Sequence, residues 1–394
     1  MVVGAAALTV IVIATLVFMS ATGRPPSALM PSHVAPTPSA IPPGYFVFPL
    51  NTTTAYVLVT SSPSSSPTLY LTVDGGRDWR RLTLPIPISD RLAAANLLAD
   101  GKLIIETWDR SDQQLTHAYV GDMAGWTVVK PPIPGGGWPH MLDSRVGVYI
   151  VSGQSASNNG HDLSIFRTLD SGTHWEQMLQ LDAAHPNAGG LSITDDHFVG
   201  FTDAAHGWVV STAQPYATVC GPTGWTPAGR LLASEDGGQT WSERLLSPLP
   251  DGSALLEPPV MIRGSAGYML ASVQSYAGKC PPGADEYAYS TTDVGVTWSA
   301  PRRLPVEFFS TLDGIDWWAT DGKSLLRSRD QGASWTSQDA RLPARDVMLG
   351  DIYPVGADTA WSFWVPAVNQ TGRAALLRTT DGGATWAEVR LPRA

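Results

Sequence analysis

A pattern of eight residues recurs along this chain and constrains its fold more than any other feature of the sequence. In each copy a Ser or Thr is followed two residues later by Asp, then two residues later by Gly, and three residues later by Trp. The six matching segments are residues 72–79, 168–175, 234–241, 291–298, 328–335 and 379–386. Such repetition predicts one supersecondary unit copied along the chain, and therefore one array of similar units.

Each residue type in the pattern suits a tight turn between two β-strands. The Asp carboxylate can accept hydrogen bonds from backbone N–H groups one to three residues ahead, which would hold an Asx-type turn. The Gly takes a positive φ at little cost, and the Trp offers a large apolar surface at the start of the next strand. Pairs of apolar residues such as Leu231 and Leu232 precede most copies, as expected of a strand buried on both faces.

These residues resemble the Asp-box, or BNR, repeat, which in known relatives joins the third and fourth strands of β-propeller blades. The segment 201–210, with sequence FTDAAHGWVV, is also similar to the repeat of photosystem II stability and assembly factors. The resemblance implies an all-β fold of the sialidase-like propeller superfamily. A calcium loop is disfavoured because one acidic residue in each repeat cannot supply the several oxygen ligands of that ion.

A seventh, degenerate copy completes the count. Asp122 and Trp126 lie in a segment without the hydroxyl residue, and Asp122 is midway between Asp74 and Asp170. We therefore predict a single seven-bladed propeller in which each blade is contiguous, so that the ring closes by side-chain packing between blades one and seven. The predicted structural turn residues are Asp74, Asp122, Asp170, Asp236, Asp293, Asp330, Asp381, Trp79, Trp126, Trp175, Trp241, Trp298, Trp335 and Trp386.

Two segments that differ in composition precede the first blade. Residues 2–19 carry no charge and are long enough to cross a bilayer or to form the apolar part of a secretory signal. We interpret residues 1–23 as a signal anchor or signal peptide, 24–43 as a Pro/Ser-rich linker and 44–394 as the propeller. This organisation predicts an extracytoplasmic protein, either anchored in the membrane by residues 2–19 or secreted after cleavage.

The charge of the chain limits its partners. With 25 Lys and Arg against 35 Asp and Glu, the formal net charge is −10, and the basic residues form no run. A nucleic-acid-binding face is therefore not expected. We expect a monomer that contacts the membrane only through its N-terminal segment and binds a protein or a glycan.

Two long loops are the candidate binding elements. Blades four and five gain residues at 213–229 and 275–287, and each insertion contains one of the two Cys residues, Cys220 and Cys280. Equivalent loops of adjacent blades lie side by side, so a disulfide is plausible, the alternative being two separately buried thiols. The aromatic residues of these loops either contact a ligand or cover the disulfide: Tyr216, Trp225, Tyr276 and Tyr287.

The sequence gives little support for catalysis. A sialidase would need an Arg triad with an Arg-Ile-Pro motif, which is absent, and the first blade before its turn contains no Arg. Oligoxyloglucan hydrolases use two carboxylates across a cleft between two propellers, and this chain has room for one. The carboxylates that could pair in space are Asp195, Asp196, Glu257, Asp285 and Glu286.

Cofactor signals are also weak. The segment Asp195, Asp196 and His197 is a lone cluster of metal-ligand residue types, and no Gly-rich phosphate loop occurs. We therefore predict no catalytic, cofactor-binding or metal-binding residue and no cofactor. The expected function is a non-catalytic binding or assembly module, and the alternative is a sialidase-like or other glycoside hydrolase acting on extracellular glycans.

Overall fold

The computed structural model describes most of the chain from residue 44 onward. The residues outside its description are 1–43, 61–66, 87–90, 109–114, 134–136, 155–160, 213–229, 250–252, 257–258, 264, 275–284, 306–308, 365–374 and 393–394. The predicted signal or anchor and the linker lie outside the described residues and stay predictions. Within the described part, no helix is long and apolar enough to cross a membrane.

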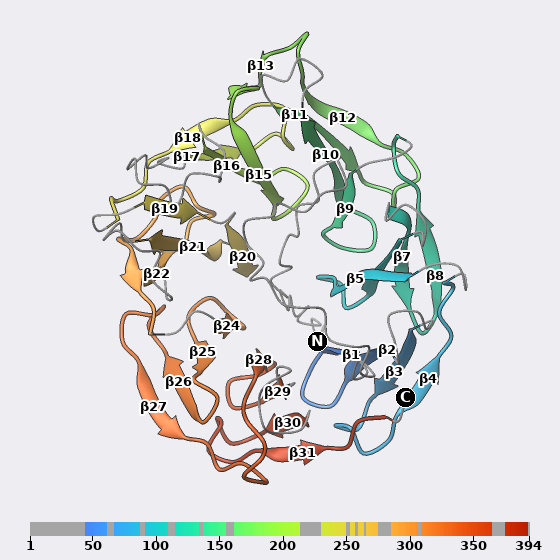
Figure 1. Cartoon of the computed structure of the whole chain (residues 1–394), viewed down its shortest axis with the longest axis vertical. Helices are drawn as coiled ribbons and strands as arrows, with labels where there is room; N and C mark the ends of the chain where they lie inside the picture. Colours follow the sequence, from blue (N-terminus) through green and yellow to red (C-terminus); the bar gives the residue numbers. More distant parts are fainter. Residues whose placement is uncertain are drawn as a thin grey trace, which may run out of the picture.

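Seven antiparallel sheets are arranged in a ring, each with its first strand near the central axis and its last strand at the rim (Figure 1). The protein is a seven-bladed β-propeller, as the repeat predicts. Every regular element among the described residues is a strand.

The first four blades are formed by consecutive segments of the chain. Blade one contains β1 (Gly44–Pro49), β2 (Ala55–Thr60), β3 (Thr68–Thr72) and β4 (Arg80–Leu82). Blade two contains β5 (Arg91–Leu97), β6 (Leu103–Trp108), β7 (Leu115–Asp122) and β8 (Gly125–Val129). Blade three contains β9 (Trp138–Met141), β10 (Gly147–Gln154), β11 (His161–Thr168) and β12 (Glu176–Leu181). Blade four contains β15 (Asp196–Phe201), β16 (Gly207–Thr212), β17 (Arg230–Ser234) and β18 (Ser242–Arg244).

The last three blades follow the same order. Blade five contains β19 (Ser253–Leu256), β20 (Val260–Arg263), β21 (Ala266–Gln274), β22 (Asp285–Thr291) and β23 (Arg302–Arg303). Blade six contains β24 (Phe309–Thr311), β25 (Trp317–Thr320), β26 (Ser324–Ser328) and β27 (Thr336–Asp339). Blade seven contains β28 (Asp351–Pro354), β29 (Ala360–Trp364), β30 (Ala375–Thr379) and β31 (Ala387–Val389).

Two departures from four strands per blade have local causes. In blade five β19 and β20 pair with different parts of β21, and the sequence between them contains Pro258 and Pro259. Proline has no N–H to give to a sheet ladder, which explains the division of this strand into two. A small hairpin, β13 (Asn187–Ala188) with β14 (Leu191–Ser192), lies between blades three and four, and the Gly189 carbonyl accepts a bond of 2.7 Å from the Trp241 N–H.

The hydrophobic core is divided among the seven seams between neighbouring blades, with one cluster of buried residues at each. In β2, for example, Leu58 packs toward blade two, whereas Val57 packs toward blade seven. Successive side chains of a strand point to opposite faces, so a blade with neighbours on both sides needs apolar residues at every position. This requirement explains the continuous apolar runs in the second and third strands.

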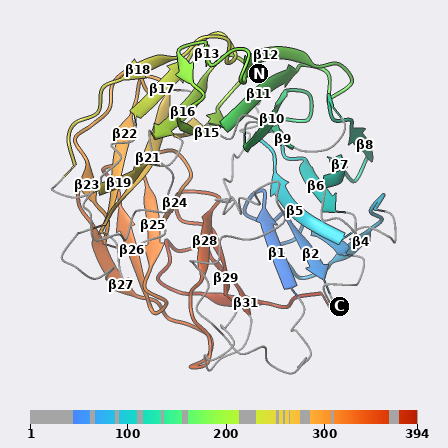
Figure 2. The same cartoon turned by 45° about the horizontal axis from the view of Figure 1, so that its top comes forward.

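Among the strands that the structure describes, none is exchanged between the first and last blades where the ring closes. Blade one and blade seven form separate sheets, and their contact consists of a packed cluster that includes Val47, Val57 and Trp361. The Trp79 indole N–H donates to the Arg390 carbonyl at 2.8 Å, which ties the chain after β31 to blade one (Figure 2). Closure therefore depends on side chains and a few hydrogen bonds.

Candidate functional site

Six of the predicted turns share one hydrogen-bond arrangement, and we call them the Asp turns. They join β3–β4, β11–β12, β17–β18, β22–β23, β26–β27 and β30–β31. In the β17–β18 turn the Ser234 hydroxyl donates to Asp236 Oδ1 at 2.8 Å and accepts the Gly238 N–H at 2.8 Å. Asp236 also accepts bonds from the backbone N–H groups of Gln239 and Thr240 and from the Thr240 hydroxyl.

These bonds hold the turn carboxylates in the ionised form. Burial alone raises the pKa of the Asp236 carboxyl, but the hydrogen bonds outweigh burial and lower its pKa to about 2. The hydrogen bonds run to residues three and four positions after the Asp, farther along the chain than a simple Asx turn suggests. The oxygens of the ionised carboxylate accept hydrogen bonds inside its own turn. A structural role is therefore sufficient to explain this Asp.

The backbone of the Asp turns has a second feature that the sequence pattern did not reveal. The residue directly after the Asp has a positive φ as well as the Gly that follows it, for example Gly75 and Gly76. In three turns this first position holds a residue with a side chain: Ser171 (φ 64°), Val294 (φ 58°) and Gln331 (φ 58°). The reversal of the chain between the third and fourth strands requires this positive φ. The turn therefore keeps it even where a side chain makes the left-handed backbone strained.

The seventh turn differs, as expected from its shorter sequence. Asp122 pairs with Gly125 in a two-residue hairpin and accepts a bond of 2.6 Å from the Ala124 N–H. Trp126 is half-buried against the cluster between blades one and two. Of the other turn tryptophans, Trp241 and Trp386 are buried, and the rest are half-buried: Trp79, Trp175, Trp298 and Trp335.

Of the Cys and aromatic residues predicted to lie in the two long loops, the structure describes one. Tyr287, expected in the second long loop, lies instead in β22, where it pairs with Ala271 and packs half-buried against the cluster between blades four and five. The strand extends to Asp285 because the alternating residues around Tyr287 fit the sheet on both faces. The remaining loop candidates, Cys220, Cys280, Tyr216, Trp225 and Tyr276, lie outside the described residues and stay predictions.

The described carboxylates considered for catalysis lie in or next to strands of blades four and five. Asp195 is buried, and its Oδ2 accepts bonds of 2.9 Å from the Ser211 hydroxyl and from Arg230. Asp196 begins β15, Asp285 and Glu286 are adjacent in β22, and Glu257 lies outside the described residues. Asp195 therefore has a structural environment, and the described residues contain no group of three potential His, Cys, Asp or Glu metal ligands.

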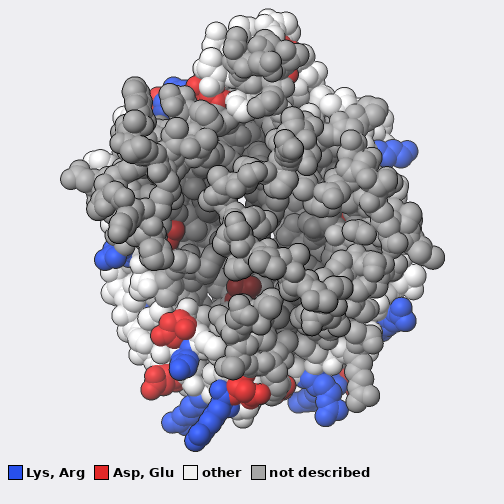
Figure 3. Space-filling model, viewed as in Figure 1, with Lys and Arg blue, Asp and Glu red and all other residues white. Residues whose placement is uncertain are grey.

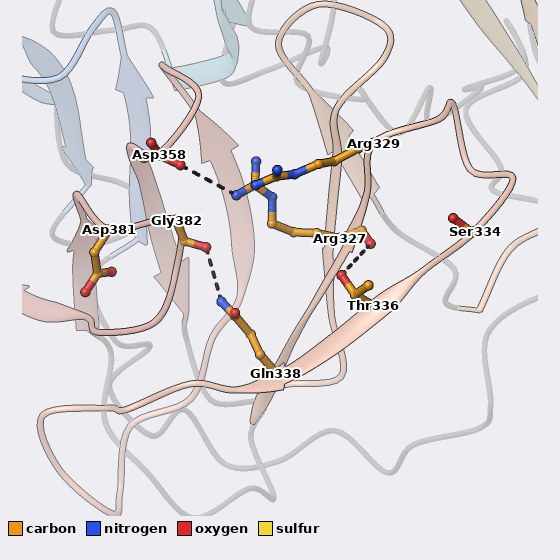
Figure 4. Close-up of a pocket in the computed structure, with 8 residues that line it drawn as sticks. All are labelled: Arg327, Arg329, Ser334, Thr336, Gln338, Asp358, Asp381 and Gly382. Atoms are coloured by element: carbon orange, nitrogen blue, oxygen red, sulfur yellow. Dashed lines mark hydrogen bonds and ion pairs between the residues drawn. The ribbon is translucent and has the colours of Figure 1, made fainter.

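A polar pocket between blades six and seven, which we call the seam pocket, is the candidate site. It has a volume of about 390 Å³. Its lining residues are Arg327, Arg329, Ser334, Thr336, Gln338, Asp358, Asp381 and Gly382 (Figure 4). Figure 3 shows basic and acidic side chains mixed along the rim over blades six and seven. Rigid strands and Asp turns from both blades thus position the pocket.

Arg327 forms the inner wall of the seam pocket. It belongs to β26, and its guanidinium lies 4.0 Å from the centre of the Trp318 ring and donates to the Ala357 carbonyl at 3.0 Å. Its nearest carboxylates, Asp316 and Asp358, are 3.7 and 3.9 Å away. Burial lowers the pKa of the Arg327 guanidinium, the charge of nearby Arg329 lowers it further, and the two carboxylates raise it.

Arg329 is exposed and follows β26 by one residue. Residues two apart in an extended chain lie on the same side, and Figure 4 shows both Arg side chains extending toward Asp358. The sequence carried a signal for this pair, since Arg327 and Arg329 flank the hydroxyl residue of the turn. The turn pattern itself predicts no role for either residue.

Most other polar groups of the seam pocket are already bonded. The Ser334 hydroxyl donates to Asp330 at 2.7 Å, and the Thr336 hydroxyl donates to the Arg327 carbonyl at 3.2 Å. Gln338 donates its amide to the Gly382 carbonyl at 3.2 Å. The side-chain hydrogen bond from Thr385 and other bonds lower the pKa of the Asp381 carboxyl. The lining groups with spare hydrogen-bonding capacity include the guanidinium donors and the exposed Asp358 carboxylate.

Two carboxyls that do not line the seam pocket have a raised pKa. Burial raises the pKa of Glu106 to about 8, and this residue sits in β6 of blade two. Asp351 is exposed at the start of β28 in blade seven. Although part of this residue is exposed, partial burial of the carboxyl removes it from water and raises its pKa, and a hydrogen bond with Tyr353 partly opposes that effect. These two blades are not neighbours in the ring.

Comparison with known proteins supports the propeller without assigning an activity. No family model matches the chain. A probable oligoxyloglucan-reducing end-specific xyloglucanase from Neosartorya fischeri is 26% identical over 172 residues, which are 41% of this chain and 21% of the enzyme. The match thus spans about a fifth of that enzyme's length.

Solved structures align with most of the chain at low sequence identity. A structure of YCF48 bound to a D1 peptide aligns with 90% of this chain and 99% of its own, at 15% identity and a TM-score of 0.43. Prolyl oligopeptidase B from Galerina marginata aligns with 86% of this chain and 48% of its own, at 10% identity and a TM-score of 0.50. At such identities the likeness concerns the fold alone.

Proposed function

We propose that this protein is a non-catalytic binding or assembly module located outside the cytoplasm. The observation that carries the proposal is the seam pocket, in which Arg327 is held between two blades beside an exposed Asp358 and the exposed Arg329 lines the same pocket. Charged groups held in place on a rigid scaffold are suited to recognising a polar partner, because little side-chain freedom is lost on binding.

The described carboxyls offer two candidates for the proton donor of a hydrolase. Glycoside hydrolysis needs a protonated carboxyl and an ionised one about 5–9.5 Å apart. Glu106 and Asp351, the described carboxyls with raised pKa, belong to blades two and seven.

The location outside the cytoplasm is proposed from the uncharged residues 2–19 and the Pro/Ser-rich linker that follows. Whether the segment anchors the protein or is cleaved, it would deliver the propeller across the membrane. Cys220 and Cys280 could then form a disulfide in an oxidising compartment, next to the loops that we expect to contact a partner.

The test is affinity capture from membranes with the full-length protein carrying a C-terminal tag, followed by identification of the bound material. Capture of the same partner in repeated preparations is expected, together with no turnover of a panel of glycosidase substrates. Mass mapping without reductant should find Cys220 joined to Cys280. Turnover of a glycan without any captured partner would contradict the binding role.

The alternative function is a glycoside hydrolase, and the similarity to the xyloglucanase over 172 residues favours it specifically. Asp351 would be its candidate acid, because it is exposed on an innermost strand and its pKa is raised. An Asp351→Asn change separates the two functions. It should abolish any hydrolysis if this carboxyl donates a proton, and it should leave partner capture unchanged if the protein only binds.

A further inference from the structure

An Arg directly precedes the hydroxyl residue in three of the Asp turns, at positions 167, 327 and 378, and the first two of these can be compared directly. Arg167 in β11 and Arg327 in β26 each precede the hydroxyl residue of an Asp turn. Each guanidinium crosses to the next blade and donates to a backbone carbonyl, that of Ala204 at 3.3 Å or that of Ala357 at 3.0 Å. The Arg at this position therefore has the same structural task at both seams.

The two seams differ in how this positive charge is compensated. Arg167 donates to Glu176 Oε2 at 2.8 Å, and Glu176 is its register partner in β12. The register partner of Arg327 in β27 is Thr336, which has no charge. The seam between blades six and seven thus lacks a carboxylate at the register position of its Arg, and the carboxylates nearest to Arg327 come from other segments of the chain.

A second difference adds charge at the same place. The residue after the turn hydroxyl is Leu169 at the first seam and Arg329 at the second. In the described part of the chain, Arg329 makes no hydrogen bond or ion pair. Asp316 and Asp358 approach Arg327 only to 3.7 and 3.9 Å, beyond hydrogen-bond distance. Two guanidinium groups consequently face the seam pocket with most of their donors unused.

We propose that the seam pocket binds the carboxylate group of a ligand between Arg327 and Arg329. The ligand carboxylate takes the place that Glu176 occupies beside Arg167, where a carboxylate accepts a charge-assisted hydrogen bond. The volume of about 390 Å³ suits a single sugar acid or amino-acid residue. The proposal rests on the proposed binding function and specifies the chemistry that one of its sites recognises.

The test measures binding of glucuronate, N-acetylglutamate and sulfate to the full-length protein by calorimetry. Both carboxylates should bind, and sulfate should bind more weakly, because the site is matched to a planar carboxylate. Binding of glucuronate alone would identify a sugar acid as the source of the carboxylate, and binding of N-acetylglutamate alone would identify an acidic peptide side chain. Failure of both to bind, or binding of sulfate alone, would overturn the proposal.

Two surface variants make the test independent of folding defects. Arg329→Leu reproduces the residue found at the other seam and should weaken carboxylate binding at least ten-fold with an unchanged melting temperature. Thr336→Glu supplies an internal carboxylate in the register of Glu176, so it should abolish binding and raise the melting temperature. Unaltered binding in both variants would refute the assignment.

A matched control comes from the first seam. Glu176→Thr removes its internal carboxylate but leaves Leu169, so it should not create a site of comparable affinity. If the wild-type protein captures a partner from membranes but binds neither carboxylate, the binding function stands and the ligand assignment falls. If it binds a carboxylate but captures no partner, the assignment of the pocket stands without the wider function.

Discussion

Replacing Asp236 with Ala tests the structural interpretation of the Asp turns. The change removes bonds from the Ser234 hydroxyl, the Gln239 and Thr240 N–H groups and the Thr240 hydroxyl, at 2.6–3.0 Å. Gln239 and Thr240 are exposed, so water can replace part of what is lost. We expect the free energy of unfolding to fall by about 1–3 kcal/mol, the cost of leaving such donors without their native partner.

The dependence of this loss on pH has a definite sign. The pKa of Asp236 is about 2 in the folded protein against an ordinary 3.8, so the folded state favours the ionised carboxyl. Its contribution is present above the ordinary pKa and disappears as the pH falls through the folded pKa. The wild type and Asp236→Ala should therefore differ in stability at neutral pH and converge between roughly pH 4 and pH 2.

Urea unfolding followed by tryptophan fluorescence measures both effects. Asp122→Ala is the matched control, because Asp122 accepts one backbone N–H in its turn and should cost less, about 0.5–1.5 kcal/mol. An equal loss in the two variants would refute the argument from hydrogen bonds. Loss of partner binding in Asp236→Ala at an unchanged melting temperature would show that the residue is functional.

Further predictions concern packing, backbone strain and the loops. Trp241→Ala should lower the free energy of unfolding by about 3–5 kcal/mol, because this buried ring packs against Phe201; an unchanged urea midpoint would contradict this. Val294→Gly should raise stability by about 0.5–1 kcal/mol by relieving a left-handed backbone, whereas Val296→Gly in the same turn should not. Deleting residues 214–226 should preserve the melting temperature and reduce partner capture, and normal capture would exclude this loop as the contact.

Much of the fold could be predicted because few folds accommodate a turn between two strands that is repeated along the whole chain. The Asp, Gly and Trp of each copy, together with the even spacing around Asp122, indicate seven blades, and the structure has seven. The division of β19 from β20 was not predicted, although Pro258 and Pro259 signal it once the strand is known to pass there. Tyr287 was predicted in the loop but lies in a strand. The boundary of a loop depends on where the hydrogen-bonded pairing of two strands ends, and residue types alone do not determine that position.

The candidate site could not be predicted from the same information. Arg327 and Arg329 come from one blade, whereas Asp358 comes from the next, and their proximity depends on the angle between blades. Local sequence contains no measure of that angle. The comparison of Glu176 with Thr336 also needs the strand register, because only pairing shows that they occupy equivalent places.

The seam between blades one and seven has a consequence for synthesis of the chain. Every other seam joins segments that emerge from the ribosome in succession, whereas this one joins Val47 and Val57 to Trp361 and Val389. Until the last blade is made, the nascent protein is an open arc with an uncovered apolar face at its first blade. Aggregation at that face competes with closure, so substitutions at this seam should reduce the yield of soluble protein more than equally destabilising substitutions elsewhere.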